Sequence, residues 1–230
     1  TNLLWYYSVK VKLFIKMQNK TLVTFGDSWP QGSELLHNEK AFGELVTKQL
    51  KCKQFKNYAH PASSINHLPV QLKSFMKMFA STMQDLSHCI AIFSLTGTSR
   101  SMTYDKDGLW MFQNPSGGYC GPTQDKQLCN YIDEHYWKFV YSPQLCDVTN
   151  NTTLISLQTI CANNGIQDYY VNGWESIDFW NDVDITKIYK GGTVTCKDLA
   201  NKNLAEGGHP NQLGHQLIAD ALTDWITNEG

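Results

Sequence analysis

The stretch TLVTFGDS, residues 21–28, decides the fold, because a short apolar run ends there in Gly26, Asp27 and Ser28. Such a run predicts a buried strand, and glycine followed by aspartate predicts a turn directly after it. Apolar residues at helical spacing then run through residues 39–50. The sequence therefore predicts a strand, a tight turn and a helix, with the serine at the turn.

Strands and helices alternate along most of the remaining chain. Further strands are predicted at residues 54–58, 89–95 and 166–171, and further helices at residues 65–83, 125–140, 143–163 and 211–228. The run CIAIFSL at residues 89–95 is apolar throughout, as in a strand buried on both faces of a parallel sheet. The alternation predicts a mostly parallel sheet covered by helices on both faces, with ligands beyond the carboxyl ends of the strands.

An aromatic-rich stretch between Met102 and Gln124 interrupts this alternation. It contains Trp110 and the pair Gly117-Gly118, and it is too irregular for a core element. We expect a loop or lid over the site, or else a packed surface excursion.

The length of 230 residues is that of a single domain, which we place at residues 17–230. Residues 1–16 form an N-terminal extension, either non-native or a first strand or amphipathic segment. Their apolar run is broken by lysines and has no small-residue cleavage site, so we expect a cytoplasmic protein without a membrane partner. The net charge of -2 gives no basic footprint for nucleic acid. The oligomeric state is left open.

The seven cysteines are an odd number without a C-x-x-C pair, which predicts reduced thiols. One bridge among Cys120, Cys129 and Cys146 stays open as an alternative. His209 and His215 form a His-x5-His pair with no third ligand nearby, so no metal is expected. No other cofactor is expected either.

Two constellations carry the candidate chemistry. Ser28, at a strand-to-helix turn, exposes its hydroxyl at the sheet edge and its N–H near a helix N-terminus, where an oxyanion is stabilised. Near the other end of the chain, EGGHPN at residues 206–211 offers Glu206 and His209 three residues apart. That carboxylate can hold the imidazole through Nδ1–H and leave Nε2 facing a hydroxyl. The alternatives are a Ser28 that merely caps a helix, a solvated Glu206 and a capping His209.

Four motifs in this order resemble the SGNH (GDSL-like) hydrolase superfamily, and most closely its branch seen in phages and marine microbes. They are GDS at residues 26–28, NYAHPASS at 57–64, TGTSR at 96–100 and EGGHPN at 206–211. The resemblance covers nearly the whole chain from Thr21 onward. It implies a three-layer α/β/α sandwich with a mostly parallel, flavodoxin-like sheet.

Three of the four motifs depart from the family pattern. Ala62 stands where glycine is expected, and we expect its N–H to serve an oxyanion provided that its φ is negative. Ser99 or Thr98 replaces an asparagine, so a rotatable hydroxyl stands in for a fixed amide donor. Arg100 either supplies charge-assisted donors or binds an anionic substrate group, or else forms a surface ion pair. Glu206 replaces aspartate with a longer arm.

The resemblance implies a serine esterase acting on short acyl esters, acetyl esters in particular, some of them on carbohydrates. Ser28 is then the nucleophile, His209 the base and Glu206 its partner, and the oxyanion hole comes from Ser28, Ala62 and Ser99. The residues assigned to substrate binding are Asp27, Thr98, Arg100 and Trp110. The alternatives are an SGNH-fold binding or structural protein with weak or no catalysis, and another hydrolase such as a thioesterase, a lipase-like esterase or a metal-dependent phosphoesterase.

Overall fold

A four-stranded parallel sheet lies at the centre of the structure, a computed structural model that describes residues 17–80, 85–104, 110–113, 119–120, 134–135, 138 and 140–228. Its strands are β1 (Thr21–Phe25), β2 (Gln54–Asn57), β3 (Cys89–Leu95) and β7 (Gln167–Asn172). They lie in the order β2-β1-β3-β7, and every neighbouring pair is parallel. Because all four strands run in the same direction, their carboxyl ends lie at one edge of the sheet.

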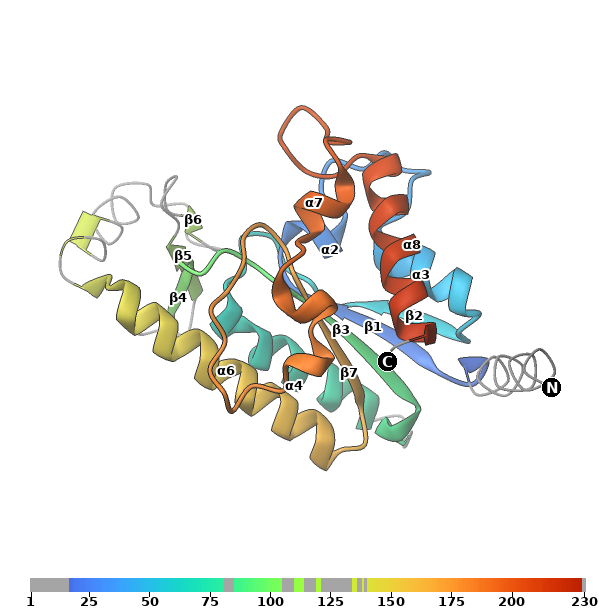
Figure 1. Cartoon of the computed structure of the whole chain (residues 1–230), viewed down its shortest axis with the longest axis horizontal. Helices are drawn as coiled ribbons and strands as arrows, with labels where there is room; N and C mark the ends of the chain where they lie inside the picture. Colours follow the sequence, from blue (N-terminus) through green and yellow to red (C-terminus); the bar gives the residue numbers. More distant parts are fainter. Residues whose placement is uncertain are drawn as a thin grey trace.

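Helices cover both faces of this sheet (Figure 1). One face carries α3 (Phe42–Leu50), α7 (Cys196–Ala200) and α8 (Gln212–Asn228), and the other carries α4 (Leu68–Ala80) and α6 (Pro143–Asn163). Strand residues alternate between the two cores: Leu22 packs with the α3 and α8 side, whereas Val23 packs with α4 and α6. The predicted three-layer α/β/α sandwich is confirmed.

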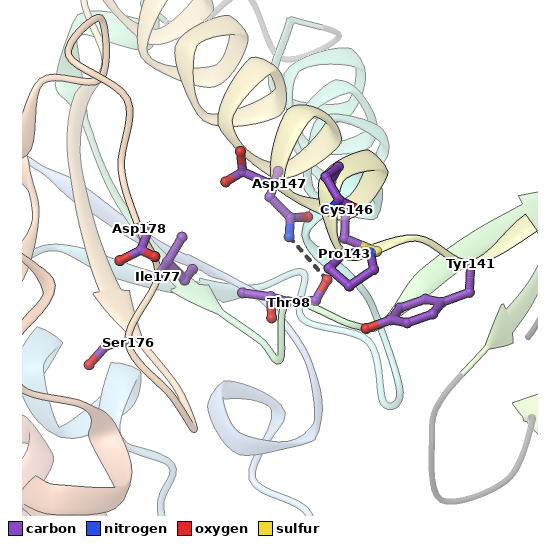
Figure 2. A pocket seen from close by; sticks show the side chains of 10 residues that line it. Thr98, Tyr141, Pro143, Cys146, Asp147, Ser176, Ile177 and Asp178 are labelled. Atoms are coloured by element: carbon purple, nitrogen blue, oxygen red, sulfur yellow. Dashed lines mark hydrogen bonds between the residues drawn. The ribbon is translucent and has the colours of Figure 1, made fainter.

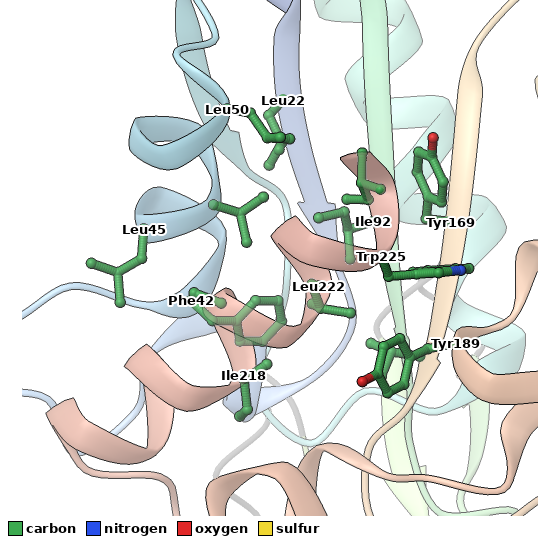
Figure 3. Packing of buried hydrophobic residues seen from close by; sticks show 14 of the residues in the cluster. Leu22, Phe42, Leu45, Leu50, Ile92, Tyr169, Tyr189, Ile218, Leu222 and Trp225 are labelled. Carbon is green, nitrogen blue, oxygen red and sulfur yellow. The ribbon is translucent and has the colours of Figure 1, made fainter. Parts of the chain in front are cut away.

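The core on the α3 and α8 side is built from aliphatic and aromatic side chains (Figure 3). Phe42 and Leu222 are fully or almost fully buried between the two helices. Trp225 packs edge-on against Tyr169 and Tyr189, with ring centroids 5.1 and 5.5 Å apart. This packing anchors the C-terminal helix α8, and therefore the loop before it, which carries His209.

The predicted elements are largely confirmed. The strands at residues 21–25 and 89–95 and the helix at 143–163 have the predicted bounds. The predicted helix at 65–83 begins as a 3-10 turn, η1 (Ile65–His67), before α4. The expected helix at 125–140 falls mostly outside the described residues, and the expected extension at 1–16 falls entirely outside them.

The prediction of a loop between Met102 and Gln124 is wrong, because a three-stranded antiparallel sheet forms there. Its strands are β4 (Ser101–Tyr104), β5 (Trp110–Gln113) and β6 (Tyr119–Cys120), in the order β4-β5-β6. The aromatic residues are those that favour strands, and Asp107-Gly108 between β4 and β5 is a dipeptide typical of hairpins. This dipeptide is the feature of the sequence that predicts the hairpin.

The thiols of Cys52, Cys89, Cys161 and Cys196 are free, in agreement with the prediction of reduced cysteines. Burial raises the pKa of the Cys89 thiol to about 12. Cys129 and the side chain of Cys120 lie outside the described residues, so a bridge there stays a prediction. Within the described part of the chain, no helix is long and apolar enough to cross a membrane.

Two histidines are buried in the layers that flank the sheet. His67, in η1, is 2% exposed and shares a 2.9 Å hydrogen bond between its Nδ1 and Ser63 Oγ. His215, in α8, is fully buried and accepts the Phe42 N–H at Nδ1. Burial, more than the nearby histidines His60 and His209, lowers the pKa of each to about 4. Both are therefore neutral in the folded chain at pH 7.

Acidification from pH 7 to pH 4 is expected to destabilise the fold. Unfolded histidines take up protons below about pH 6.5, whereas the buried pair stays neutral down to about pH 4. The unfolded state therefore binds more protons in this window, and the free energy of unfolding falls by up to about 3 kcal/mol per histidine. Urea unfolding at several pH values measures the slope, and His215→Asn, which keeps an acceptor for Phe42, is expected to reduce it. An equal slope in the variant would refute this assignment.

Candidate active site

The turn after β1 is held in a conformation that only glycine adopts easily. Gly26 has a φ of +143°, and a Cβ there would lie 2.7 Å from Pro30 Cγ and 2.9 Å from the Ser94 carbonyl oxygen. The Gln71 side chain clamps this residue: its Oε1 accepts the Gly26 N–H and its Nε2 donates to the Gly26 carbonyl, each at 2.8 Å. The clamp fixes where the next element, and with it Ser28, begins.

Ser28 is the first residue of the short helix α2 (Ser28–Gln31), and Asp27 is its N-cap. Its side chain lies at the carboxyl edge of the sheet, and the residue is 8% exposed. The first N–H groups of a helix have no partner within the helix, so the N–H of Ser28 is available to a ligand. The predicted placement of Ser28 at a strand-to-helix turn is confirmed.

The structure brings together Ser28, His209 and a carboxylate. His209 Nε2 lies 2.9 Å from Ser28 Oγ, and His209 Nδ1 lies 2.6 Å from Glu34 Oε2. A carboxylate only accepts hydrogen bonds, so this contact assigns the proton to Nδ1 and leaves Nε2 to accept the serine hydroxyl. This is the order of contacts that nucleophile, base and orienting carboxylate require.

The carboxylate in this set is Glu34 and not Glu206, which corrects the sequence prediction. The backbone of the EGGHPN loop wraps around Glu34, whose carboxylate also accepts the N–H groups of Gly207 at 2.8 Å and His209 at 3.2 Å. A Cβ at Gly207 would lie 2.3 Å from Glu34 Oε1, so a side chain there would push the Glu34 carboxylate out of its present position. Glu206 is exposed and makes no recorded contact with His209 in the described part of the chain.

The surroundings of Glu34 favour its ionised form. The hydrogen bond from the His209 side chain lowers the pKa of Glu34 most, and the backbone N–H groups of His209 and Gly207 lower it further. The side chains of His209 and Glu34 are 21% and 31% exposed. Water therefore reaches the set, and Glu34 carries its charge at neutral pH.

The expected oxyanion donors differ in how they are presented. Ala62 has a φ of +61°, so the condition of a negative φ, on which its assignment to the oxyanion rested, is not met: alanine here adopts the left-handed conformation that glycine adopts at lower cost. Among the described residues, its N–H has no recorded acceptor. Thr98 is engaged, because its N–H and hydroxyl both donate to Glu175 Oε1, at 2.6 and 2.8 Å. Ser99 follows in the same loop and is partly exposed.

Asp27 and Arg100 form an ion pair beneath the candidate nucleophile. Asp27 is 1% exposed, and Arg100 Nη1 lies 2.8 Å from its Oδ2. The same carboxylate accepts the N–H of Trp29, the hydroxyl of Thr96 and the indole Nε1–H of Trp174. The assignment of Asp27 to substrate binding is therefore corrected, because its oxygens are buried and already bonded.

Arg100 is 15% exposed, so its ion pair is not the surface pair that the sequence left as one alternative. Its Nη1 also donates to Thr96 Oγ1 at 2.8 Å, and its guanidinium lies over the Trp174 ring. Among the described residues, Nε and Nη2 have no recorded partner. Two of its donor groups therefore remain available.

Replacing Arg100 with methionine is expected to lower the free energy of unfolding by about 3 kcal/mol, the lower end for breaking a buried ion pair. The loss leaves the Asp27 charge buried, although three other donors still reach it. Urea unfolding measures the effect, and the pair of changes Asp27→Asn and Arg100→Met is expected to recover part of it. A loss below about 0.5 kcal/mol would mean that the pair contributes no more than an exposed one.

Trp110 and His215 are the remaining residues that the sequence analysis considered. The Trp110 side chain lies outside the described residues, so its role in substrate binding stays a prediction. His215 is buried, and its Nδ1 accepts the Phe42 N–H. In the ranges that the structure describes, no three His, Cys, Asp or Glu side chains are placed to hold a metal ion.

The comparisons with known proteins gave matches among solved structures alone. No family model matches the chain, and no curated protein matches it. A member of the lipolytic protein G-D-S-L family from Veillonella parvula is similar over 91% of this chain and 99% of its own, with 13% identity and a TM-score of 0.49. The psychrotrophic esterase EstA from Pseudoalteromonas sp., in a structure inhibited by monoethylphosphonate, is similar over 91% and 100%, with 13% identity and a TM-score of 0.47. A carbohydrate esterase described as having divergent catalytic and non-catalytic binding functions is similar over 90% and 64%, with 13% identity and a TM-score of 0.44.

Proposed function

We propose that this chain is a serine esterase that hydrolyses short acyl esters, acetyl esters in particular, through an acyl-enzyme on Ser28. The observation that carries the proposal is the continuous path of hydrogen bonds from Ser28 through His209 to Glu34. A hydroxyl paired with a neutral imidazole nitrogen is activated for attack, and a carboxylate on the far nitrogen stabilises the imidazolium that forms.

The reaction proceeds in two steps. Ser28 Oγ attacks the ester carbonyl carbon while its proton passes to His209 Nε2, and the carbonyl oxygen becomes an oxyanion. The intermediate collapses, the bond to the alcohol oxygen breaks, and His209 returns the proton to the leaving alcohol. Water, deprotonated by His209, then attacks the acyl carbon, the bond from that carbon to Ser28 Oγ breaks, and His209 gives its proton back to Ser28 Oγ as the acid leaves.

The oxyanion is stabilised by N–H groups that point at the reacting centre. We assign this role to the backbone N–H of Ser28 together with the Ser99 hydroxyl, and not to Ala62, because its positive φ fails the condition on which that assignment rested. Arg100 adds a positive charge beside the turn, and its two unbonded donor groups can reach either the oxyanion or an anionic acyl group. The Thr98 hydroxyl donates to Glu175, so it can meet the substrate only as an acceptor.

A binding protein that keeps this fold with little or no catalysis is the second candidate. The observations that favour it are the left-handed Ala62 and the absence of an amide side chain at Ser99. Loss of one oxyanion donor lowers a rate by about 10²–10³. The two candidates therefore differ in whether Ser28 reacts at all.

A fluorophosphonate probe tests the proposal, since it forms a covalent adduct only with an activated serine. Intact mass and peptide mapping are expected to show a single adduct on Ser28 in the parent chain and none in Ser28→Ala. Circular dichroism confirms that both chains are folded. A folded parent chain that stays unlabelled would refute the esterase and support the binding protein.

A further inference from the structure

A cavity of about 400 Å³ opens among the loops that follow β3 and β7 and the start of α6 (Figure 2). Three segments line it: the loop after β3, the chain entering α6 with its first turns, and the loop after β7. The lining residues are Thr98, Tyr141, Pro143, Gln144, Cys146, Asp147, Asn150, Ser176, Ile177 and Asp178. None of them belongs to the set formed by Ser28, His209 and Glu34.

The cavity is close to Ser28 through two short stretches of chain. Thr96 and Trp174 both donate to Asp27, the residue before Ser28. Thr98 and Ser176, which line the cavity, each follow two residues later, a span of at most about 7 Å. A substrate whose carbonyl carbon lies at Ser28 can therefore extend its alcohol portion into the cavity.

The walls of the cavity are fixed by buried amides. Asn150 is 3% exposed and donates from Nδ2 to the Thr98 carbonyl at 3.1 Å, which joins α6 to the loop after β3. Asn151 is fully buried and donates to the Asp178 carbonyl at 3.1 Å, which joins α6 to the loop after β7. The three segments are therefore held together before any ligand binds, as a preformed pocket requires.

The cavity presents acceptors and negative charge. Asp147 and Asp178 are the charged residues among the ten that line it, and no lysine, arginine or histidine is among those ten. Trp180 Nε1 and the Asn151 amide already bond the Asp147 carboxylate, whereas the exposed Asp178 carboxylate has no recorded partner in the described part of the chain. The Oδ1 of Asn150 accepts no hydrogen bond from any described residue, so it is a further acceptor. These groups match a ligand that donates hydrogen bonds and carries positive charge.

We propose that this cavity binds the alcohol portion of the ester and selects one that carries a primary ammonium group, as an amino sugar does. Asp178 pairs with the ammonium, and the Asn150 Oδ1 accepts one of its N–H groups. An alcohol that carries a carboxylate is repelled. The proposal rests on the proposed esterase for the position of the carbonyl, but the charge preference of the cavity does not depend on turnover.

The test uses three acetate esters of equal chain length: 5-acetoxypentylammonium, hexyl acetate and 5-acetoxypentanoate. In the parent chain, kcat/KM is expected to fall in that order, with about a tenfold difference between the cation and the anion. Asp178→Asn is expected to reduce that ratio at least about fivefold. Asp224→Asn, which removes a carboxylate from the helix on the opposite face of the sheet, is the matched control and is expected to keep it.

A second measurement separates this proposal from the esterase itself. Calorimetric titration of the same three esters into Ser28→Ala reports binding without hydrolysis, and the cation is expected to bind most tightly. If the cation binds most tightly to Ser28→Ala while the parent chain hydrolyses none of the three esters, the cavity proposal is supported and the esterase proposal is refuted. Equal binding of cation and anion, or a preference unchanged by Asp178→Asn, would overturn the proposal for the cavity whatever the rate of hydrolysis.

Discussion

Replacing His209 with alanine is expected to lower kcat for 4-nitrophenyl acetate by about 10⁴–10⁶-fold, the range seen when a hydrolase loses the base of such a set. The Ser28 hydroxyl then has no group to take its proton, because Nε2 is the only ring nitrogen that it contacts among the described residues. The N–H groups around the oxyanion remain, so a small residual rate above that in water is expected.

The loss in His209→Ala is expected to be catalytic and not structural. The His209 side chain is 21% exposed, so its removal leaves no sealed cavity, and urea unfolding is expected to give a midpoint close to that of the parent. His37→Ala is the matched control, because His37 lies in an exposed stretch between α2 and α3 and contacts none of the three residues. A His209→Ala chain that keeps more than about one tenth of the parent rate would exclude His209 as the base.

Ser28 and His209 were predictable because local sequence determines where each lies. An apolar strand followed by Gly26 and Asp27 can end only in a turn at the sheet edge, and that turn places Ser28. The EGGHPN loop stands directly before an amphipathic helix that must pack on the sheet, which brings His209 to the same edge. The strong hydrophobic periodicity on either side of the two motifs was sufficient to predict that Ser28 and His209 lie at the same edge of the sheet.

Glu34 was not predictable in the same way. It lies 175 residues from His209 in the sequence and meets it only after α2 and α8 have packed on the sheet. Its own stretch, Gly32-Ser33-Glu34, has the composition of any surface turn. The one signal was Gly207, because a side chain there would displace the carboxylate that accepts its backbone N–H.

The sequence could not show which residue pairs with Arg100. Arg100 is the single arginine of the chain, but no spacing connects it with Asp27, which lies 73 residues away. The pairing depends on the strand order, which sets β3 beside β1 and so brings the TGTSR loop over the GDS turn. Trp174 reaches the same carboxylate from the loop after β7, the next strand along.

Replacing Glu34 with glutamine is expected to lower kcat by about 10²–10⁴-fold. Glutamine keeps an oxygen that can accept the Gly207 and His209 backbone N–H groups, so the loop stays in place. It loses the negative charge that stabilises the imidazolium, and its amide can favour the tautomer with the proton on Nε2, which cannot accept the serine proton. The 31% exposure of the Glu34 side chain lets water replace part of the contact, which favours the lower end of this range.

Glu206→Gln is the matched control, since it removes the carboxylate that sequence spacing alone assigned to His209. Both residues are glutamates that flank the same loop, and both variants lose one charge, so a general electrostatic effect would lower both rates alike. Steady-state kinetics on 4-nitrophenyl acetate are expected to show a loss in Glu34→Gln and a rate within about twofold of the parent in Glu206→Gln. The reverse result would restore Glu206 as the partner of His209 and would mean that the 2.6 Å contact with Glu34 is not the one used in catalysis.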